Sequence, residues 1–460
     1  MSLTIINREA EQALLRDSLE HRPSLVVMMG RRRVGKSFLL AATLTGKRVV
    51  SLQGDEQGEA QHLQLLAEEA GRVLLGAPAL RFESWDAALA FCGAQATQEP
   101  LILVLDEFQY LLDAQPALDS IIQRHWDRWQ RDGVPILLVL CGSALLLMEH
   151  LLAHGSPLYG RATARPLLKP LDYRDAAAFT RTRHPIELIR RYAVLGGTPQ
   201  YQVWAGPGDL RRLIRDRILS TGAPLYEEPL HLLRQGEGIR DPGTYVAILR
   251  AVAGGATAHN EIAQQAEIST GNLSKKLDRL EALGYVAPVF PLSAEGVEGR
   301  SVYRIADPFF RFWFRYVARN RSRLERGRAE EVLAEVMADL DNLLGDVFEE
   351  CCRHWVGWYA SEEVVGRFEQ IGRFWSREGQ TEIDVVGVRA HRYELLGSCK
   401  WRRTVGDDVL DALYEARARL GGRAARAKLV LFAREGFTRP LEERAPEEGV
   451  LLVRAAELFT

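Results

Sequence analysis

The sequence predicts a multidomain α/β protein, and three observations lead to this prediction. The chain has 460 residues, which is too long for a single hydrophobic core. An apolar run at residues 25–29 leads through a glycine-containing loop into a helical pattern, and two further apolar runs, at 101–105 and 136–140, end near polar residues. Apolar residues make up 47% and charged residues 26% of the chain, which excludes a disordered or fibrous protein.

Charge and targeting features narrow the function classes. The net charge of −2 argues against a globally basic nucleic-acid binder, so such binding would need local patches. Residues 1–21 lack the basic start and apolar core of a secretion signal, and no apolar run is long enough to span a membrane. We therefore expect a soluble, cytoplasmic protein. The cysteines show neither an even framework nor CxxC spacing, which favours packing roles in a reducing compartment; they are Cys92, Cys141, Cys351, Cys352 and Cys399.

The loop after the first apolar run carries the strongest motif. Residues 30–37 are GRRRVGKS and match the phosphate-loop pattern GxxxxGK[ST] between a predicted strand and a predicted helix. The two glycines let backbone N–H groups approach phosphate oxygens, the lysine would reach the β and γ phosphates, and the serine hydroxyl would hold Mg²⁺. We therefore expect ATP and Mg²⁺ to bind here. The candidate nucleotide-binding residues of this segment are Gly30, Arg33, Gly35, Lys36, Ser37 and Phe38.

The second apolar run supplies a partner for this loop. It is followed by Asp106, expected to orient Mg²⁺ through water, and by Glu107, expected to polarise the water that attacks the γ-phosphate. Together with Ser37, Asp106 is the predicted metal-binding residue, and Lys36 joins both acids as a predicted catalytic residue. The alternative, a solvated acidic turn, is disfavoured because the phosphate loop is present. The third run ends in Ser143, which would either sense the γ-phosphate or cap a helix.

Several segments of the first half resemble a known family. They are IINREAEQALL, GRRRVGKS, LVLDEFQYLL, LCGSALLLME, SPLYGRATARPLLKPL and YAVLGGTPQYQ, in chain order. Together they resemble the archaeal-type ATPases of the STAND class (MNS clade) of P-loop NTPases. The resemblance implies an AAA-like P-loop sheet of the additional-strand type, with phosphate-loop (Walker A) and acidic (Walker B) motifs and a helical lid.

The same resemblance implies two further roles in the nucleotide site. Gly197 and Pro199 would lie in the lid against the nucleotide; without the resemblance, this segment is simply a helix-breaking turn. Arg161 would stabilise charge on the transferring phosphate, in cis or from a neighbouring subunit of a homo-oligomer, or else is a plain surface arginine.

The middle of the chain is predicted to be mainly helical. Residues 186–233 have helical spacing and would form the lid, and helices at 245–252, 260–265 and 269–283 precede a two-stranded hairpin, the order of a winged helix. The third helix would enter the major groove of DNA, or the segment is only a packing module. The candidate DNA contacts are Asn272, Lys275, Lys276, Arg279 and, in the hairpin, Arg300 and Arg304.

The segment at 309–328 combines aromatic rings with arginines. Such residues either stack bases and grip phosphates or form a core with a solvated or interdomain face, and we favour the second interpretation.

From residue 346 the chain resembles the C-terminal domain of unknown function often fused to these ATPases, which itself resembles the PD-(D/E)XK nuclease fold. Glu349, Asp384 and Lys400 match the pattern that metal-dependent phosphodiester cleavage needs. Ser398, however, stands where a second carboxylate is expected, and Glu382 is the residue placed to replace it. We therefore expect a fold kept for nucleic-acid binding or packing rather than an active nuclease.

These segments define five predicted domains and one leading function. The domains are a P-loop ATPase core (1–175), a helical lid (176–238), a winged helix (239–310), linker helices (311–345) and a nuclease-like domain (346–460). The leading hypothesis is an ATP-hydrolysing switch that couples nucleotide state to DNA or partner binding. The alternatives are an ATP-gated, metal-dependent DNA nuclease and a nucleotide-binding signalling scaffold with little turnover.

Overall fold

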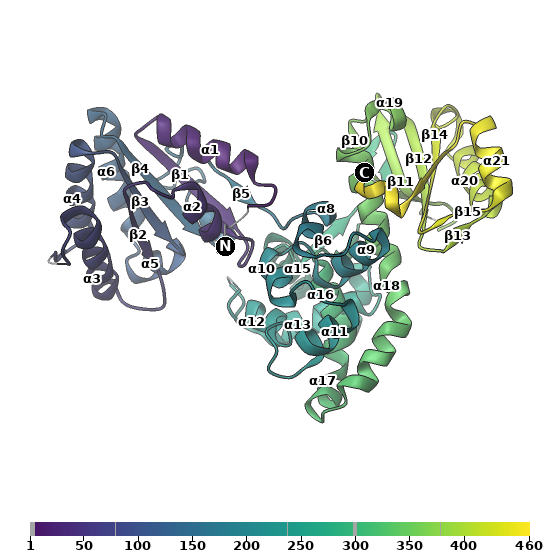
Figure 1. Ribbon diagram of the computed structural model, residues 1–460, viewed down its shortest axis with the longest axis horizontal. Coiled ribbons are helices and arrows are strands. Elements are labelled where there is room, and N and C mark those ends of the chain that lie inside the picture. Colours follow the sequence, from purple (N-terminus) through teal and green to yellow (C-terminus); the bar gives the residue numbers. More distant parts are fainter. Residues whose placement is uncertain (1–4, 79, 237, 298–300, 378) are drawn as a thin grey trace. The chain divides into compact units, whose positions relative to one another are not determined.

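A computed structural model describes residues 5–78, 80–236, 238–297, 301–377 and 379–460 (Figure 1). The chain forms two compact units: one runs to Pro170 and takes in Thr198–Gln200, and the other comprises Leu171–Gly197 and Tyr201–Thr460. Among the described residues, no helix is both long and apolar enough to cross a membrane.

A five-stranded parallel sheet forms the centre of the first unit. Its strands, in spatial order, are β2 (Val49–Gln53), β3 (Leu101–Asp106), β4 (Ile136–Gly142), β1 (Ser24–Gly30) and β5 (Leu167–Leu168). Every residue of β1, β3 and β4 is buried, as expected for a parallel sheet covered on both faces. The multidomain α/β class predicted from the sequence is therefore confirmed, with a parallel central sheet.

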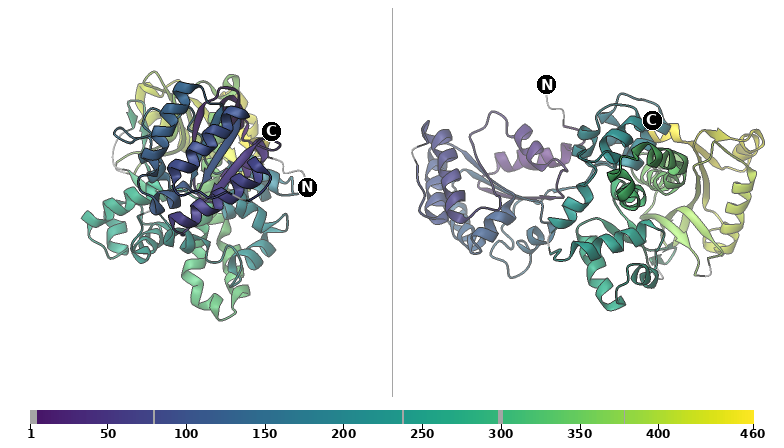
Figure 2. Two further views of the ribbon diagram at one scale, coloured as in Figure 1. Left: turned by 90° about the vertical axis from the view of Figure 1, so that its left-hand side faces the viewer. Right: turned by 90° about the horizontal axis from the view of Figure 1, so that it is seen from below.

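Helices cover both faces of this sheet (Figure 2). Val26 and Met28 of β1 share a core with α1 (Glu9–Glu20) and α2 (Lys36–Thr43). Leu25 and Val27 point the other way, because side chains alternate along a strand, into a second core with several helices. These helices are α3 (Glu59–Ala70), α4 (Trp85–Gln98), α5 (Phe108–Ala114), α6 (Leu118–Asp132) and α7 (Leu145–His150).

The second unit begins with helices, as predicted. They are α8 (Tyr173–Ala176), α9 (Pro185–Leu195), α10 (Pro199–Ala205), α11 (Leu210–Leu213) with a π-helical continuation to Leu219, and α12 (Glu228–Arg234). Three helices follow, α13 (Pro242–Ala253), α14 (His259–Gln265) and α15 (Thr270–Ala282). An antiparallel pair comes next, β6 (Val286–Val289) with β9 (Val302–Ile305), and a short hairpin lies between them, β7 (Leu292–Ser293) with β8 (Gly296–Val297). The predicted order of three helices and a hairpin is thus present.

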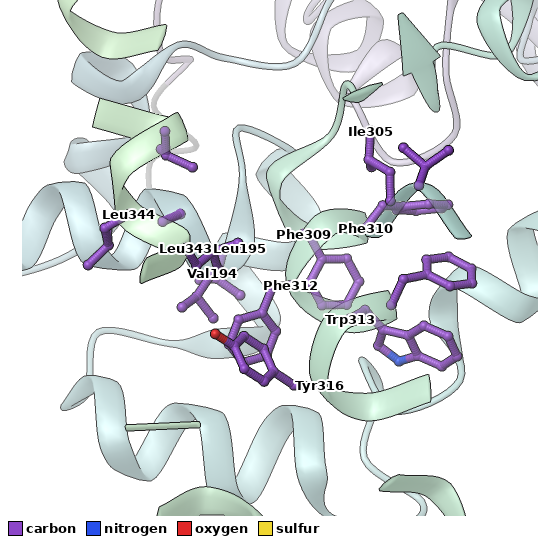
Figure 3. Close-up of a cluster of buried hydrophobic side chains, with 14 of the residues drawn as sticks. Val194, Leu195, Ile305, Phe309, Phe310, Phe312, Trp313, Tyr316, Leu343 and Leu344 are labelled. Carbon is purple, nitrogen blue, oxygen red and sulfur yellow. The ribbon is translucent and has the colours of Figure 1, made fainter. Parts of the chain in front are cut away.

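Aromatic side chains after β9 are core residues of the second unit. Phe309, Phe310, Phe312 and Trp313 belong to α16 (Pro308–Phe312) and the π-helical turn that continues it, and all are buried. Figure 3 shows these rings beside side chains of α9 and of α18 (Ala329–Trp358). Ion pairs engage the arginines Arg311, Arg315, Arg321, Arg323 and Arg328 of this segment, which continues into α17 (Ala318–Glu325). Burial and pairing favour the core interpretation over a base-stacking surface.

A second sheet forms the C-terminal module. Its strands, in spatial order, are β10 (Gln370–Trp375), β11 (Glu382–Arg389), β12 (Arg392–Lys400), β14 (Lys428–Ala433) and β16 (Leu451–Arg454). The first three are antiparallel and the last three parallel. The helices α20 (Asp407–Arg419) and α21 (Arg439–Glu447) connect the parallel strands, and the smaller elements are α19 (Glu362–Val365), β13 (Thr404–Val405) and β15 (Gly436–Phe437).

The core of the second unit is continuous across the predicted domain boundaries. One cluster of buried side chains extends from Tyr173 to Leu458, and α18 is a single helix of 30 residues that runs through the predicted boundary at 345/346. Strands β10 and β16 were not predicted, because exposed and half-buried positions interrupt their apolar patterns. The five predicted domains remain a prediction.

Gly197 stands where another part of the backbone comes very close. A Cβ atom at this position would lie 1.7 Å from the carbonyl oxygen of Leu171, whose N–H donates to the Gly197 carbonyl at 2.8 Å.

We expect Gly197→Ala to lower the free energy of unfolding by at least about 2 kcal/mol, because backbone must move to admit the methyl group. Thermal or urea unfolding measures this. Gly208→Ala is the matched control, since nothing lies within 4 Å of its added Cβ; equal loss in both variants would contradict the explanation.

Candidate functional sites

The loop between β1 and α2 has a backbone that suits an anion. Arg33 and Gly35 both adopt left-handed conformations, with φ of 69° and 98°. Successive turns of this kind point backbone N–H groups into a concave surface that binds anions. A Cβ on Gly30 would lie 2.8 Å from the Leu168 carbonyl oxygen, so the start of the loop also requires a glycine. The phosphate-loop residues predicted from the motif are thus built into a tight turn.

Lys36 is buried at the start of α2. Its Nζ donates to the carbonyl oxygens of Gly30, at 2.8 Å, and Arg31, at 3.3 Å. The loop therefore holds the ammonium group against its own backbone. Phe38, two residues along the helix, is partly exposed.

Ser37, in the helix after β1, and Asp106, the last residue of β3, come together. The Ser37 hydroxyl donates to Asp106 Oδ2 at 2.6 Å, and Asp106 Oδ1 accepts from the Glu107 N–H at 2.9 Å. Burial, together with the negative charge of Asp106, raises the pKa of the nearby Cys141 thiol well above its usual value. A hydroxyl and a carboxylate are hard oxygen ligands, so this pair fits Mg²⁺.

Glu107 has a strained backbone and a side chain held by two polar neighbours. Its φ of 48° is left-handed, a conformation that non-glycine residues often adopt at functional sites. Its Oε2 accepts from the Ser143 hydroxyl at 2.7 Å and from the Gln109 amide, and that amide also donates to the Ser143 oxygen at 3.2 Å. The prediction placed Ser143 near this site but missed Gln109, which no motif spacing marks.

A second contact missed by sequence reasoning joins the phosphate loop to α5. Arg32 Nη2 donates to the Tyr110 hydroxyl at 2.6 Å. Neither residue is fixed by the phosphate-loop pattern, so only the fold reveals the pair.

The segment predicted to lie against the nucleotide contacts the phosphate loop through Gln200. Pro199 opens α10, and the N–H of Gln200 lies 3.5 Å from the carbonyl oxygen of Arg33, a long hydrogen bond. Gly197 packs instead against Leu171, as described above.

Arg161 is engaged elsewhere in the first unit. Its Nε and Nη2 donate to the two carboxylate oxygens of Asp127 at 2.7 and 2.9 Å, and its Nη1 donates to the Pro157 carbonyl at 3.0 Å. The bidentate Asp127 contact raises the pKa of Arg161. A role in phosphate chemistry would require this ion pair to open.

The predicted remnant of a nuclease site lies where β11 and β12 meet α18. Asp384 is buried, and its Oδ2 accepts from the Cys399 N–H at 2.7 Å, the Ser398 hydroxyl at 3.2 Å and Lys400 Nζ at 3.4 Å. Ser398 therefore donates a hydrogen bond to the carboxylate in place of adding a second negative charge.

Two arginines complete this C-terminal site. Arg353 Nη1 lies 3.4 Å from Glu349 Oε2 and donates to the Asp384 carbonyl at 2.6 Å. Arg373 lies between two acids, with Nη1 3.8 Å from Glu349 Oε2 and Nη2 paired with Glu382. Over the described residues, no group of three or more His, Cys, Asp or Glu side chains is arranged to hold a metal ion. Guanidinium groups thus supply the positive charge beside Glu349 and Glu382.

Sequence reasoning missed both arginines, for different reasons. Arg353 follows Glu349 by four residues, a spacing that favours ion pairs on a helix and could have identified it. Arg373 belongs to β10, a strand that the pattern did not predict.

Helix α15 presents its predicted polar face only in part. Leu273, Leu277 and Leu280 are buried as expected, and Asn272 and Lys275 are exposed. The other two candidates are half-buried against neighbouring segments: Lys276 Nζ lies 4.7 Å from the centre of the Tyr245 ring, and Arg279 packs beside Gly238.

Two arginines of the hairpin, Arg300 and Arg304, were predicted to contact DNA. Arg300 lies outside the described residues. Arg304 Nη1 donates to Asp346 of α18 at 2.7 Å, and Leu292 and Ala294 of the hairpin are buried in the core of the C-terminal module. This part of the hairpin therefore serves packing.

Comparisons with known proteins identify similar chains. A family model described as archaeal and bacterial proteins of unknown function matches residues 313–411. An uncharacterized protein of Methanocaldococcus jannaschii is 26% identical over 407 residues, covering 88% of this chain and 89% of that protein.

Solved structures of two archaeal proteins are also similar to the chain. A Walker-type ATPase of Pyrococcus abyssi has a TM-score of 0.48 and 24% identity, covering 68% of this chain and 96% of its own. The ORC2 protein of Aeropyrum pernix, solved with ADPNP and ADP, has a TM-score of 0.45 and 15% identity, covering 74% and 98%.

Glu349 makes stability depend on pH. Burial and the negative charge of Asp384 raise its pKa to about 7. A carboxyl whose pKa is higher in the folded state binds its proton more tightly there, so its contribution to stability falls as pH rises through the interval between the unfolded and folded pKa values. Glu349→Gln should therefore raise the melting temperature by about 2 to 4 °C at pH 8 and by much less near pH 5.

The control for this measurement is Glu362→Gln, which changes an exposed carboxyl of the same module. A difference between Glu349→Gln and the unmodified protein that did not vary with pH would refute the assignment.

Proposed function

We propose that the chain binds ATP with Mg²⁺ and hydrolyses it, and that its nucleotide state controls binding of DNA or a protein partner. One observation carries the proposal: Ser37 contacts Asp106, and Glu107 contacts Ser143, at the edge of a parallel sheet beside a phosphate loop. This arrangement supports a P-loop fold of the additional-strand type, in which β4 separates β1 from β3.

Each polar group has a role that its position supports. The loop N–H groups and Lys36 would bind the phosphates, and bound Mg²⁺, near Ser37 and Asp106, would neutralise their charge. Glu107 would take a proton from the attacking water, while Ser143 and Gln109 orient its carboxylate.

The proposed roles of Pro199 and Arg161 both require part of the chain to move. Pro199 would bring the start of α10 to the nucleotide, because the next residue already reaches Arg33. Arg161 would have to leave Asp127 before it could stabilise phosphate charge, in the same chain or in a second copy.

DNA binding through residues 239–310 is a second proposed function. The order of α13, α14, α15 and the β6–β9 pair supports a winged helix, and the exposed side chains of Asn272 and Lys275 support α15 as its recognition helix. Of the predicted cations of α15, Lys275 is exposed and Lys276 and Arg279 are half-buried, so this helix would neutralise few phosphates.

Two alternatives are separated from this proposal by simple measurements. An ATP-gated nuclease with a PD-(D/E)XK-like C-terminal domain would cleave plasmid DNA with Mg²⁺ or Mn²⁺ and lose the activity in Asp384→Ala; pairing of Glu382 with Arg373 and the place of Ser398 disfavour it. A signalling scaffold would bind ATP with almost no turnover.

Substitutions in the phosphate site test ATP hydrolysis. Lys36→Ala is expected to abolish ATP binding, because the phosphates lose their ammonium partner. Glu107→Gln should still bind ATP but turn it over about 10² to 10⁴ times more slowly, because the amide cannot accept the proton. Lys47→Ala, an exposed lysine just after α2, is the control. Unchanged turnover in both site variants would refute the proposal.

The DNA contact is tested by binding and by ATPase rate. Lys275→Ala should weaken binding of duplex DNA at all sequences and lower the salt dependence of log K by about one, because one phosphate contact is lost. Duplex DNA should change the ATPase rate of the unmodified protein. The exposed Lys169→Ala in the first unit is the control; if it behaves as Lys275→Ala does, α15 is not the contact.

A further inference from the structure

The second unit contains a cavity that takes no part in the proposed ATP site or in the proposed DNA contact of α15. Its volume is about 850 Å³, within the range of small-ligand sites. Three parts of the unit enclose it: β6 and β9 with the adjoining loop, the last turns of α18, and β10 at the edge of the C-terminal sheet.

Four arginines from four elements line this cavity: Arg304 (β9), Arg311 (α16), Arg353 (α18) and Arg373 (β10). Each has an acidic partner, but a guanidinium group carries five N–H donors and one carboxylate satisfies only some of them.

Several of these donors are buried without an acceptor. Nε and Nη1 of Arg373, Nη1 of Arg311 and Nε of Arg304 have no hydrogen-bond partner among the described residues. The side chains of Arg373 and Arg311 are only 6% and 8% exposed. Arg304 and Arg311 also line a second cavity, of about 580 Å³, whereas Arg373 lines only the larger of these two cavities. Buried donors of native proteins are normally paired, so these N–H groups leave the positive charge of the cavity wall only partly compensated. They have almost no accessible surface of their own, so an anion would reach them only after the guanidinium groups shift.

Aromatic rings stand around the same cavity. Trp358 is 78% exposed, the highest value for a large apolar side chain in the described part of the chain, and Phe290 is 42% exposed. Phe368 is half-buried in the lining, and His354 stacks on Trp358 with ring centres 6.0 Å apart. Exposed rings beside arginines suit a ligand with a flat base and a phosphate.

The acidic residues of the lining are already engaged. Glu350 accepts from Arg311 Nη2 at 2.6 Å, and Glu369 accepts from the Ala390 N–H at 3.2 Å. Glu350 therefore fixes one N–H group of Arg311, whereas Glu369 is held by the backbone and no printed contact joins it to an arginine of the lining.

We propose that this cavity binds a nucleotide unit, with its phosphate on Arg353 and Arg373 and its base on Trp358 and Phe290. The unit is either a free mononucleotide or one residue of single-stranded DNA, since the two share this chemistry and the volume excludes a duplex. The site deepens the proposed function by giving the C-terminal module a nucleic-acid contact, but it requires neither ATP hydrolysis nor α15.

The test measures binding of three probes by fluorescence anisotropy. They are labelled oligothymidylate of about 12 nucleotides, a duplex of the same length and a fluorescent mononucleotide. All proteins carry Lys36→Ala, which removes binding at the phosphate loop. The rim variant adds Trp358→Ala and Phe290→Ser, two exposed side chains whose loss leaves the core intact. Tyr159→Ala, an exposed aromatic of the first unit, is the control.

The rim variant should bind the single strand at least about tenfold more weakly than the Tyr159→Ala protein, because stacked bases are lost. An equal loss for the mononucleotide would identify a free nucleotide as a ligand, whereas a loss for the single strand alone would identify DNA. Either result supports the site. Arg353→Met should also reduce the salt dependence of binding, with thermal unfolding used to verify its fold.

Two outcomes would overturn the site. Equal affinities of the rim variant and the Tyr159→Ala protein for every probe would show that the cavity is not used, and no binding of the single strand or mononucleotide to the parent protein would show the same. ATP turnover of the protein with Lys36 intact is measured separately, so failure of this site and failure of the ATPase proposal are distinguishable.

Discussion

The proposed nucleotide site depends on the parallel register of three strands. Met29 of β1 is level with Gly142 of β4, and Leu105 of β3 is level with Leu140 of the same strand. Since the carboxyl ends of parallel strands meet at one edge of a sheet, the phosphate loop, the two acids and Ser143 follow their strands to the same place. Because β4 pairs with β3, Ser143 at the end of β4 reaches Glu107 at the end of β3.

The buried carboxylates of the C-terminal module have different partners from those near the phosphate loop. Near the phosphate loop, a hydroxyl and a carboxylate form a pair suited to a metal ion, whereas Glu349 lies beside two guanidinium groups. Arginine stays charged when buried and carries several donors, so its charge offsets part of the negative charge of the acids while some of its N–H groups remain outside these pairs. The same geometry that disfavours metal-dependent cleavage therefore favours binding of a phosphate.

Sequence patterns predicted much of this architecture because continuous apolar runs and helical spacing are local. The strands around residues 25–29 and 101–105 and the three helices before the hairpin were correctly placed. Strand β10 escaped prediction because glycine and arginine interrupt its apolar positions, and Arg373 escaped with it. Gln109 could not be assigned because its role arises only from contacts with Glu107 and Ser143.

The sequence by itself predicted the loop after β1 and the two acids at the end of β3, because a short motif and its neighbouring strand specify them locally. Only the tertiary structure decided which charged groups pair. Arg161 meets Asp127, Arg304 meets Asp346, and Arg353 and Arg373 meet Glu349. Most of these partners come from different elements, so the packing of strands and helices decides which of a chain's many arginines reaches which acid.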